Sequence, residues 1–166
     1  MGVKYKTVKD RLPEIEKAIK GLSNTTVIVG ALKGSHAYLA GIHEYGCDIP
    51  VTPKMRAYLH HQGLHLKDST THIKIPERSF LRTGHDENVD RVMTQTGRAI
   101  GQVIAGEMSV DDLVDLYGQQ MSTAIKTYMR DLSKPGNHPY TVEQKGSSNP
   151  LVDTGALIES IVWEKK

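Results

Sequence analysis

"VDDLVDLYGQQMSTAIKTYMRDL", residues 110–132, carries the most regular apolar pattern in the sequence. Its apolar side chains recur at three- and four-residue steps, at Val110, Leu113, Val114, Tyr117, Met121, Ala124, Ile125, Tyr128 and Leu132. This spacing places them on one face of an α-helix. Ser109 has the position of an N-terminal cap, while Lys126 and Arg130 suit the negative end of the helix dipole. We therefore expect a long amphipathic helix here.

A second pattern of the same kind precedes it. The apolar positions are Val89, Val92, Met93, Thr96, Ile100, Val103 and Ile104, and Gly106 follows them. These positions predict a second long helix. Gly97 and Gly101 each weaken it by about 1 kcal/mol relative to alanine, unless another backbone packs close to them.

Shorter elements are expected before this helix pair. Val8, Leu12, Ile15 and Ile19 predict an amphipathic helix over residues 7–20. Pro13 favours a start near Leu12, and Gly21 is expected to end the helix. "TTVIVGA", residues 25–31, is typical of a buried strand.

Two further elements complete this prediction. "SHAYLAGIHEYG", residues 35–46, predicts a helix with Ser35 as its cap and Gly46 as its end. Its expected apolar side consists of Tyr38, Leu39, Ile42 and Tyr45. "SKPGNHP", residues 133–139, breaks the chain, and "LIESIVWE", residues 157–164, predicts a final strand.

Residues 47–78 have no sustained apolar period. They contain Pro50, Pro53 and Pro76, and five of the eight histidines lie between residues 60 and 85. We expect a surface excursion, folded as a hairpin with a short helical turn at "KMRAYLHH", residues 54–61. Long excursions of this kind often carry binding contacts.

The order of these elements predicts the fold class α+β. A small antiparallel sheet is expected to pack against the two long amphipathic helices. The 166 residues are expected to form a single domain, 1–166, with the surface excursion 47–78 inside it.

Composition narrows the function classes. Hydrophobic residues make up 38% and charged residues 24%, and the net charge of +2 is too small to indicate a nucleic-acid or membrane partner by itself. Cys47 is the single cysteine, so no internal disulfide is expected. The first residues lack an apolar signal core, and no run approaches about 18 apolar residues. We expect a protein made and used in a cytoplasm, without a membrane partner.

Asp153-Thr154-Gly155 raises the possibility of an aspartic protease, whose catalytic loop carries the same string. Such an enzyme needs two carboxylates that share a proton, so this chain would have to act as a dimer. Only residues 156–166 follow the string, where a retroviral-type protease needs most of its β-barrel. A turn in which Asp153 or Thr154 caps the backbone is the better interpretation. The protease remains as a remote alternative.

Other kinds of site receive little support. "HEYGC" begins like a zinc-protease motif, but Cys47 stands where the second histidine should be. His61 and His65 have helical spacing without a cysteine pair or carboxylate nearby, so solvated histidines are expected, with no metal and no cofactor. A nucleic-acid module remains an alternative. It would use basic residues of the 47–85 region, namely Lys54, Arg56, Lys67, Lys74, Arg78 and Arg82.

Three blocks of the sequence carry a family resemblance. They are "VIVGALKGSHAYLAGIHEYG" (27–46), "IPERSFLR" (75–82) and "YTVEQKGSSNPLVDTGALIESIVWE" (140–164). In this order they resemble the tail-completion, or virion-morphogenesis, proteins of tailed bacteriophages, which act at the head–tail joint. The matching positions are Ala40, Ile42, Glu44, Tyr45, Gly46, Ile75, Pro76, Arg78, Phe80, Leu81, Thr141, Lys145 and 150–161. Ser79 departs from the family, which more often has proline there, and the histidine-rich excursion is long for the group.

The resemblance implies a structural virion protein without enzyme activity. It implies a homo-oligomeric, six-fold ring at the neck, between the head connector or head-completion proteins and the tail tube or tail terminator. DNA would be passing cargo, and the host cytoplasm the place of assembly. The structural motif would consist of Glu44, Tyr45, Gly46, Pro76, Arg78, Phe80, Asp153, Thr154 and Gly155.

Elementary chemistry suggests a task for several of these residues. Pro76 restricts Ile75 to extended geometry. Arg78 is expected to brace a loop through a carboxylate, with Glu44 as one candidate. Phe80, the single phenylalanine, is expected to anchor the end of the excursion in the core. The turn at 153–155 would deliver Leu157 and the strand 161–163 to the sheet.

Overall fold

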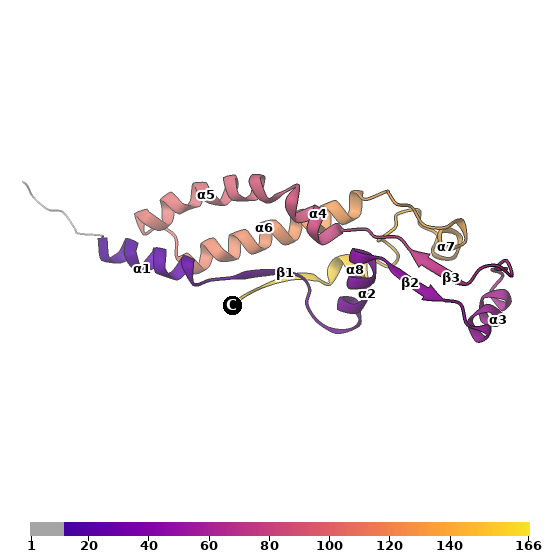
Figure 1. Cartoon of the computed structure of the whole chain (residues 1–166). Helices are drawn as coiled ribbons and strands as arrows, with labels where there is room; N and C mark the ends of the chain where they lie inside the picture. Colours follow the sequence, from indigo (N-terminus) through magenta and orange to yellow (C-terminus); the bar gives the residue numbers. More distant parts are fainter. Residues whose placement is uncertain (1–11) are drawn as a thin grey trace, which may run out of the picture.

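The computed structural model describes residues 12–166 and has the predicted α+β class (Figure 1). Its elements are α1 (Leu12–Ser23), β1 (Val27–Ala31), α2 (Gly34–Tyr45), β2 (Cys47–Pro50), α3 (Pro53–His61), β3 (His72–Ile75), α4 (Phe80–Asp86), α5 (Val89–Ala105), α6 (Val110–Asp131), α7 (Pro139–Lys145), α8 (Ala156–Glu159) and β4 (Ile161–Lys165). No helix in this part of the chain is long and apolar enough to cross a membrane.

Helices α5 and α6 form the long axis of the body, as their apolar patterns predict. α6 begins with a capping box: the Ser109 hydroxyl accepts from the Asp112 amide at 3.0 Å, and the Asp112 carboxylate accepts from the Ser109 amide at 3.2 Å. α5 ends at Gly106, whose φ of 71° suits glycine. Buried side chains of the two helices pack against one another, and α6 also packs against the sheet.

The sheet of the body consists of β1 and β4, which pair antiparallel with Val29 opposite Trp163. It packs on α6, on the side away from α5 (Figure 1). Gly118 makes this close approach possible, because a Cβ atom there would lie 2.3 Å from Cδ2 of Trp163. The core between these layers includes the fully buried Phe80, Met121, Met129, Ile161 and Val92.

Residues 47–75 form a hairpin arm, which projects from one end of the body (Figure 1). Strands β2 and β3 pair antiparallel, with Cys47 opposite Ile75 and Pro50 opposite His72. At the tip, Thr52 caps α3 by accepting from the Met55 amide at 3.1 Å. The predicted hairpin with a helical turn is therefore confirmed, and Pro76 does follow an extended Ile75.

Three boundaries differ from the sequence prediction. Gly21 lies inside α1 rather than ending it, because the helix continues to Ser23. Ser35 is not the cap of α2; the helix begins at Gly34, which turns the chain at a φ of 71°. Residues 7–11, including Val8, lie outside the described residues.

Other differences concern which side chains are buried. In α2 the buried residues are Ala40 and Glu44, while Tyr38 and Tyr45 are exposed, so the expected apolar side does not face the core. At the other end of the chain, the residues around Leu157 form helix α8, and only Ile161 onward is strand. Helices α4 and α7 have no counterpart in the prediction because each has only seven residues, fewer than two full turns.

Candidate functional site

The arm meets the body in a polar junction, defined here as Glu44, Arg78, Arg82 and the loop 133–137. α2 ends at this place, the arm returns through residues 76–79, and the loop arrives from the end of α6. Gly46 turns the chain from α2 into the arm at a φ of 72°. A side chain at residue 46 would lie 2.9 Å from both the Glu77 amide and the Ile75 carbonyl. Glycine is therefore required at the pivot of the arm.

Glu44 joins α2 to the first turn of α4. Its carboxylate is 2% exposed and accepts hydrogen bonds from the backbone amides of Leu81 at 2.8 Å and Arg82 at 3.0 Å. The Arg82 guanidinium adds a third bond, from Nε to Oε1 at 2.9 Å. These hydrogen bonds satisfy the buried Glu44 carboxylate, which therefore serves as a fixed structural anion.

Arg82 links the buried Glu44 carboxylate to groups at the protein surface. It also bonds Glu77 at 2.6 Å and lies over the Tyr45 ring, with its Cζ atom 4.8 Å from the ring centroid. Hydrogen bonds to Glu44 and then to Glu77 raise the pKa of Arg82 above its ordinary value. Tyr45 thus remains exposed while covering the guanidinium.

Arg78 binds the loop 133–137 rather than Glu44, so the expected contact between Arg78 and the Glu44 carboxylate is wrong. The 3% exposed guanidinium donates from Nε to the Pro135 carbonyl at 2.9 Å and from Nη2 to the Gly136 carbonyl at 3.1 Å. A further bond joins Nη2 to Asn137 Oδ1 at 3.0 Å. Glu44 is already occupied by the start of α4, which leaves the carbonyls of the loop as the acceptors for Arg78. Burial lowers the pKa of Arg78.

His43 completes the environment of Arg78. Its Nδ1 lies 3.2 Å from Nη1 of Arg78, and its carbonyl accepts from the Arg78 amide at 2.7 Å. Burial, followed by the charges of Arg78 and Lys145, lowers the pKa of His43 from 6.5 to about 4. The imidazole is therefore neutral at pH 7 and accepts a hydrogen bond from the guanidinium.

The third block meets the first beside this junction. A groove of about 320 Å³ has walls formed by α2, α7 and the segment 150–157, and its lining includes Leu39, Thr141, Lys145, Asp153 and Thr154. Lys145 Nζ donates to the Asn149 carbonyl at 2.7 Å, and burial lowers its pKa although Asp153 opposes this effect. The ammonium thus holds the loop that leads into α8.

The Asp-Thr-Gly string forms the turn before α8. The Thr154 hydroxyl accepts from the Ala156 amide at 3.3 Å, and Gly155 caps the helix at a φ of 86°. Asp153 is exposed and makes no hydrogen bond to any of the described residues. Beyond it the chain forms only α8 and β4, so the string delivers Leu157 to the core, as the turn interpretation predicts.

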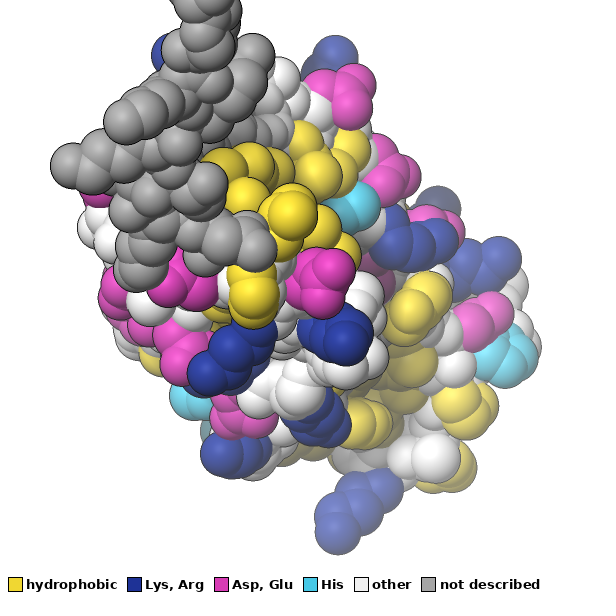
Figure 2. Space-filling model, turned by 90° about the vertical axis from the view of Figure 1, so that its left-hand side faces the viewer, with side chains coloured by type: hydrophobic (Ala, Val, Ile, Leu, Met, Phe, Trp, Pro, Cys, Tyr) yellow, Lys and Arg dark blue, Asp and Glu magenta, His cyan; other side chains and the backbone are white. Residues whose placement is uncertain are grey.

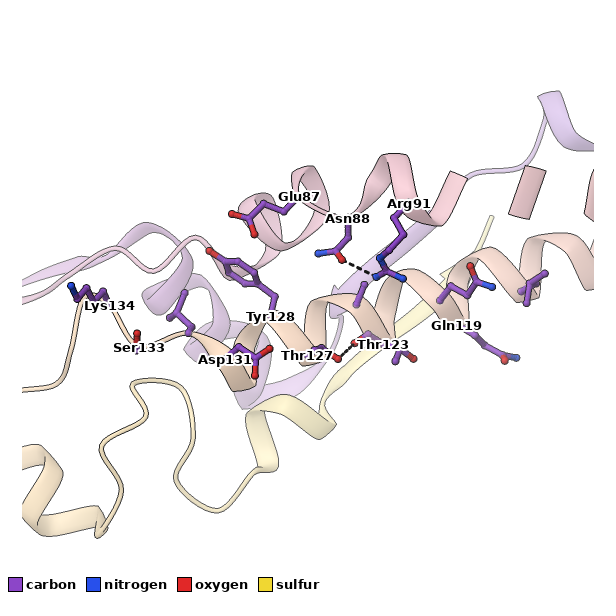
Figure 3. Close-up of a pocket in the computed structure, with 14 residues that line it drawn as sticks. Glu87, Asn88, Arg91, Gln119, Thr123, Thr127, Tyr128, Asp131, Ser133 and Lys134 are labelled. Atoms are coloured by element: carbon purple, nitrogen blue, oxygen red, sulfur yellow. Dashed lines mark hydrogen bonds between the residues drawn. The ribbon is translucent and has the colours of Figure 1, made fainter. Parts of the chain in front are cut away.

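A larger polar groove, of about 840 Å³, runs along α6 and was not predicted from the sequence (Figure 3). Its lining includes Glu87, Asn88, Arg91, Gln119, Gln120, Thr123, Thr127, Tyr128, Asp131, Ser133 and Lys134. Arg91 donates to Asn88 at 2.8 Å, and Thr127 bonds the Thr123 carbonyl at 3.0 Å. The sequence feature that could have predicted this groove is the set of polar residues at four-residue steps in α6, such as Thr123, Thr127 and Asp131. Neither histidine nor cysteine lines this groove, so it lacks their nucleophile and base chemistry.

The three arginines among the basic residues of the 47–85 region are engaged within the protein. Arg56 donates to the carbonyls of Leu66, Lys67 and Thr70, at 3.3, 2.9 and 2.6 Å. Arg78 is buried and Arg82 is paired with two carboxylates. These arginines are therefore not free to bind phosphate. The three lysines of the same region, Lys54, Lys67 and Lys74, are exposed.

The junction therefore combines Glu44 of the first sequence block with Arg78 and Arg82 of the second, and the third block lies beside it. Tyr45 and Gly46 adjoin the junction, whereas Phe80 belongs to the hydrophobic core. Between residues 12 and 166 no three potential histidine, cysteine or carboxylate ligands come together around a common point. Comparison of the chain with family models, with curated proteins and with solved structures gives no match.

Proposed function

We propose that this protein is a structural component of a tailed-bacteriophage virion. It completes the tail and joins it to the head connector, as a homo-oligomeric ring at the neck between the connector or head-completion proteins and the tail tube or terminator. DNA passes through the ring as cargo. The proposal rests on the resemblance of the three sequence blocks and on the use of their residues in this fold.

The observation that carries the proposal is the rigid attachment of the hairpin arm. The arm projects from the body, and Glu44, Arg78 and Arg82 fix both sides of its base through buried hydrogen bonds. Such a scaffold presents a loop to a partner in one orientation, which suits an assembly contact. Of the motif residues, Glu44, Gly46 and Arg78 hold the arm in place, and none of the motif is arranged as a nucleophile with a base.

An apolar surface at the other end of the body supports self-association. On α5 the side chains of Met93, Ile100 and Ile104 are 55%, 43% and 48% exposed. Gly97 and Gly101 lie among them, with nothing within 4 Å of a built Cβ. Figure 2 faces this end and shows hydrophobic side chains gathered on it. Exposed apolar surface of this kind is typical of protein interfaces, and a head-to-tail contact that closes gives a ring.

The decisive experiment uses the phage or prophage that carries the gene. An early stop codon is introduced, and the lysate is examined by negative-stain electron microscopy. Separate heads and tails, or tails of aberrant length, are expected. A plasmid copy of the intact gene should restore joined virions, which controls for effects on neighbouring genes. Normal infectious virions from the stop-codon phage would refute the proposed function.

The contribution of the arm is tested in the same system. Residues 52–70 are replaced by Asn-Gly, because Val51 and Thr71 are hydrogen-bonded at 2.8 Å and a two-residue turn can close this hairpin. We expect the shortened protein to fold but to fail in restoring head–tail joining. If it restores joined virions, the arm is not the partner contact, although the function itself would stand.

A further inference from the structure

The tip of the arm brings two histidine rings into direct contact. His60 lies in the last turn of α3, and His65 lies in the loop that follows. Their Nδ1 atoms are 2.7 Å apart, and the rings meet edge to face with centroids 4.4 Å apart. The sequence spacing favours His61 as the neighbour of His65, but the structure pairs His65 with His60.

The backbone holds both histidines at fixed positions. The chain reverses directly after α3, where the Gly63 amide donates to the His60 carbonyl at 3.0 Å and the Leu64 amide to the Leu59 carbonyl at 2.8 Å. Gly63 permits this reversal with a φ of 87°. His65 therefore follows a residue that is hydrogen-bonded to the helix of His60.

Arg56 fixes the other side of the loop. Its guanidinium lies on α3 and donates to three carbonyls of the segment 66–70. His65 is thus held between two anchored stretches, 63–64 and 66–70. A site whose ligands are placed before binding does not have to order the loop when an ion arrives, which favours affinity.

We propose that His60 and His65 form a two-nitrogen site for a late first-row transition-metal ion. Cu(II) is the ion bound most tightly, and Ni(II) is the next. In the free protein one Nδ1 carries a proton and donates to the other. When the ion binds, this proton moves to Nε2 of the same ring, and both rings turn so that their Nδ1 lone pairs, which face one another in the hydrogen bond, converge on the metal. Water completes the coordination shell.

The number and type of the ligands set the expected preference among metal ions. The Irving–Williams order favours Cu(II) over the other divalent first-row ions at a pair of imidazole nitrogens, with Ni(II) above Co(II), Fe(II) and Mn(II). Zn²⁺ sites in proteins usually have three or four protein ligands, more than the two that His60 and His65 supply. The site should therefore discriminate against Zn²⁺.

A bound ion would link the end of α3 to its loop at the outermost part of the arm. This inference is independent of the proposed virion function, because it depends only on the local geometry. It is tested on the purified full chain by isothermal titration with CuCl₂, NiCl₂ and ZnCl₂. We expect one Cu(II) per chain, weaker Ni(II) binding and the weakest response to Zn²⁺.

Substitutions identify the ligands. His60→Ala and His65→Ala should each weaken Cu(II) binding at least tenfold, and His61→Ala, which changes the adjacent residue, should leave it unchanged. Circular dichroism and thermal unfolding verify that each variant is folded. Electron paramagnetic resonance of the Cu(II) form should show hyperfine coupling to two nitrogens, reduced to one in His60→Ala. Unchanged affinity in both ligand variants, or an equal loss in His61→Ala, would overturn the proposal.

Discussion

Arg78 shows how one side chain determines the attachment of the arm. It is a buried cation that binds three oxygen acceptors of the loop 133–137 and the ring of His43, with no carboxylate among these partners. Five donors in a planar fork make arginine suitable for such a set of acceptors, and lysine lacks this geometry. The sequence indicated that Arg78 would brace a loop, and only the structure identified which loop.

Removal of this side chain should be costly. Arg78→Met leaves buried carbonyl groups without donors, so we expect the free energy of unfolding to fall by about 3 kcal/mol. Urea denaturation followed by circular dichroism measures the change. Arg91→Met is the matched control, because Arg91 is exposed and its loss should change stability by less than about 0.5 kcal/mol. Equal effects of the two substitutions would contradict the structural role of Arg78.

His43 should make the junction sensitive to acid. Its pKa is lowered to about 4 in the folded protein, while the unfolded chain takes up the proton near 6.5. The unfolded state therefore binds more protons between these values, and stability is lost as the pH falls from 6.5 towards 4. The contribution of His43 is at most about 3 kcal/mol.

His43→Gln removes this titration while keeping a hydrogen-bond acceptor. We expect the difference in unfolding free energy between pH 7.5 and pH 5 to be smaller in the variant than in the parent protein. Urea denaturation at the two pH values provides the comparison, and His61→Gln, at an exposed position, should behave like the parent. An unchanged difference in His43→Gln would show that His43 does not titrate as described.

At the level of elements, two glycines in long helices have opposite roles. Gly118 in α6 lies against Trp163, whereas Gly97 in α5 faces open space. Gly118→Ala forces the indole or β4 to shift, so we expect a loss of about 1–3 kcal/mol. Gly97→Ala should raise stability by about 0.5–1 kcal/mol. Fluorescence of the single tryptophan during denaturation measures the change in unfolding free energy for both variants. If both substitutions stabilise the protein, or both destabilise it, the roles given to the two glycines are wrong.

The elements also show how far the sequence could be interpreted. Periodicity predicted α5 and α6 because each follows one regular pattern over its whole length, and the β-branched run predicted β1. The hairpin was predicted without an apolar period, from the lack of one and from its prolines. For α2 the pattern predicted the helix but not its buried side, because Glu44 is a carboxylate that accepts hydrogen bonds from another helix, so its burial depends on residues distant in sequence. The short α4 and α8 are stabilised by tertiary contacts, and a local pattern contains no signal for those.

The candidate site was predicted only in part. Glu44 and Arg78 of the junction were singled out individually, and Phe80 is buried in the core as expected. Their partners were not identified, because Glu44 meets Arg82, and Arg78 meets the loop 133–137, only when segments distant in sequence come together in the fold. The contact of His60 with His65 likewise depends on the reversal at Gly63, which helical spacing does not indicate.

At the level of the whole molecule, the partly exposed apolar face of α5 formed by Met93, Ile100 and Ile104 should mediate self-association. Ile100→Asp places a charge on this face, and we expect weaker association in sedimentation velocity experiments over a range of protein concentrations. Thr94→Asp is the control, because Thr94 is an exposed position on the same helix outside the apolar set. If both variants associate like the parent protein, the ring must form through another surface.

The arm and its base can also be described mechanically. The arm is a lever whose pivot is Gly46 and whose fixed points are Glu44 and Arg78. A sideways load at its tip produces a torque at this base, where several short hydrogen bonds are strained at the same time. Bonds loaded together share the force, so the base should yield later than the two-stranded hairpin, whose bonds can open one after another. Force applied at the tip would thus bend the arm before it detaches from the body.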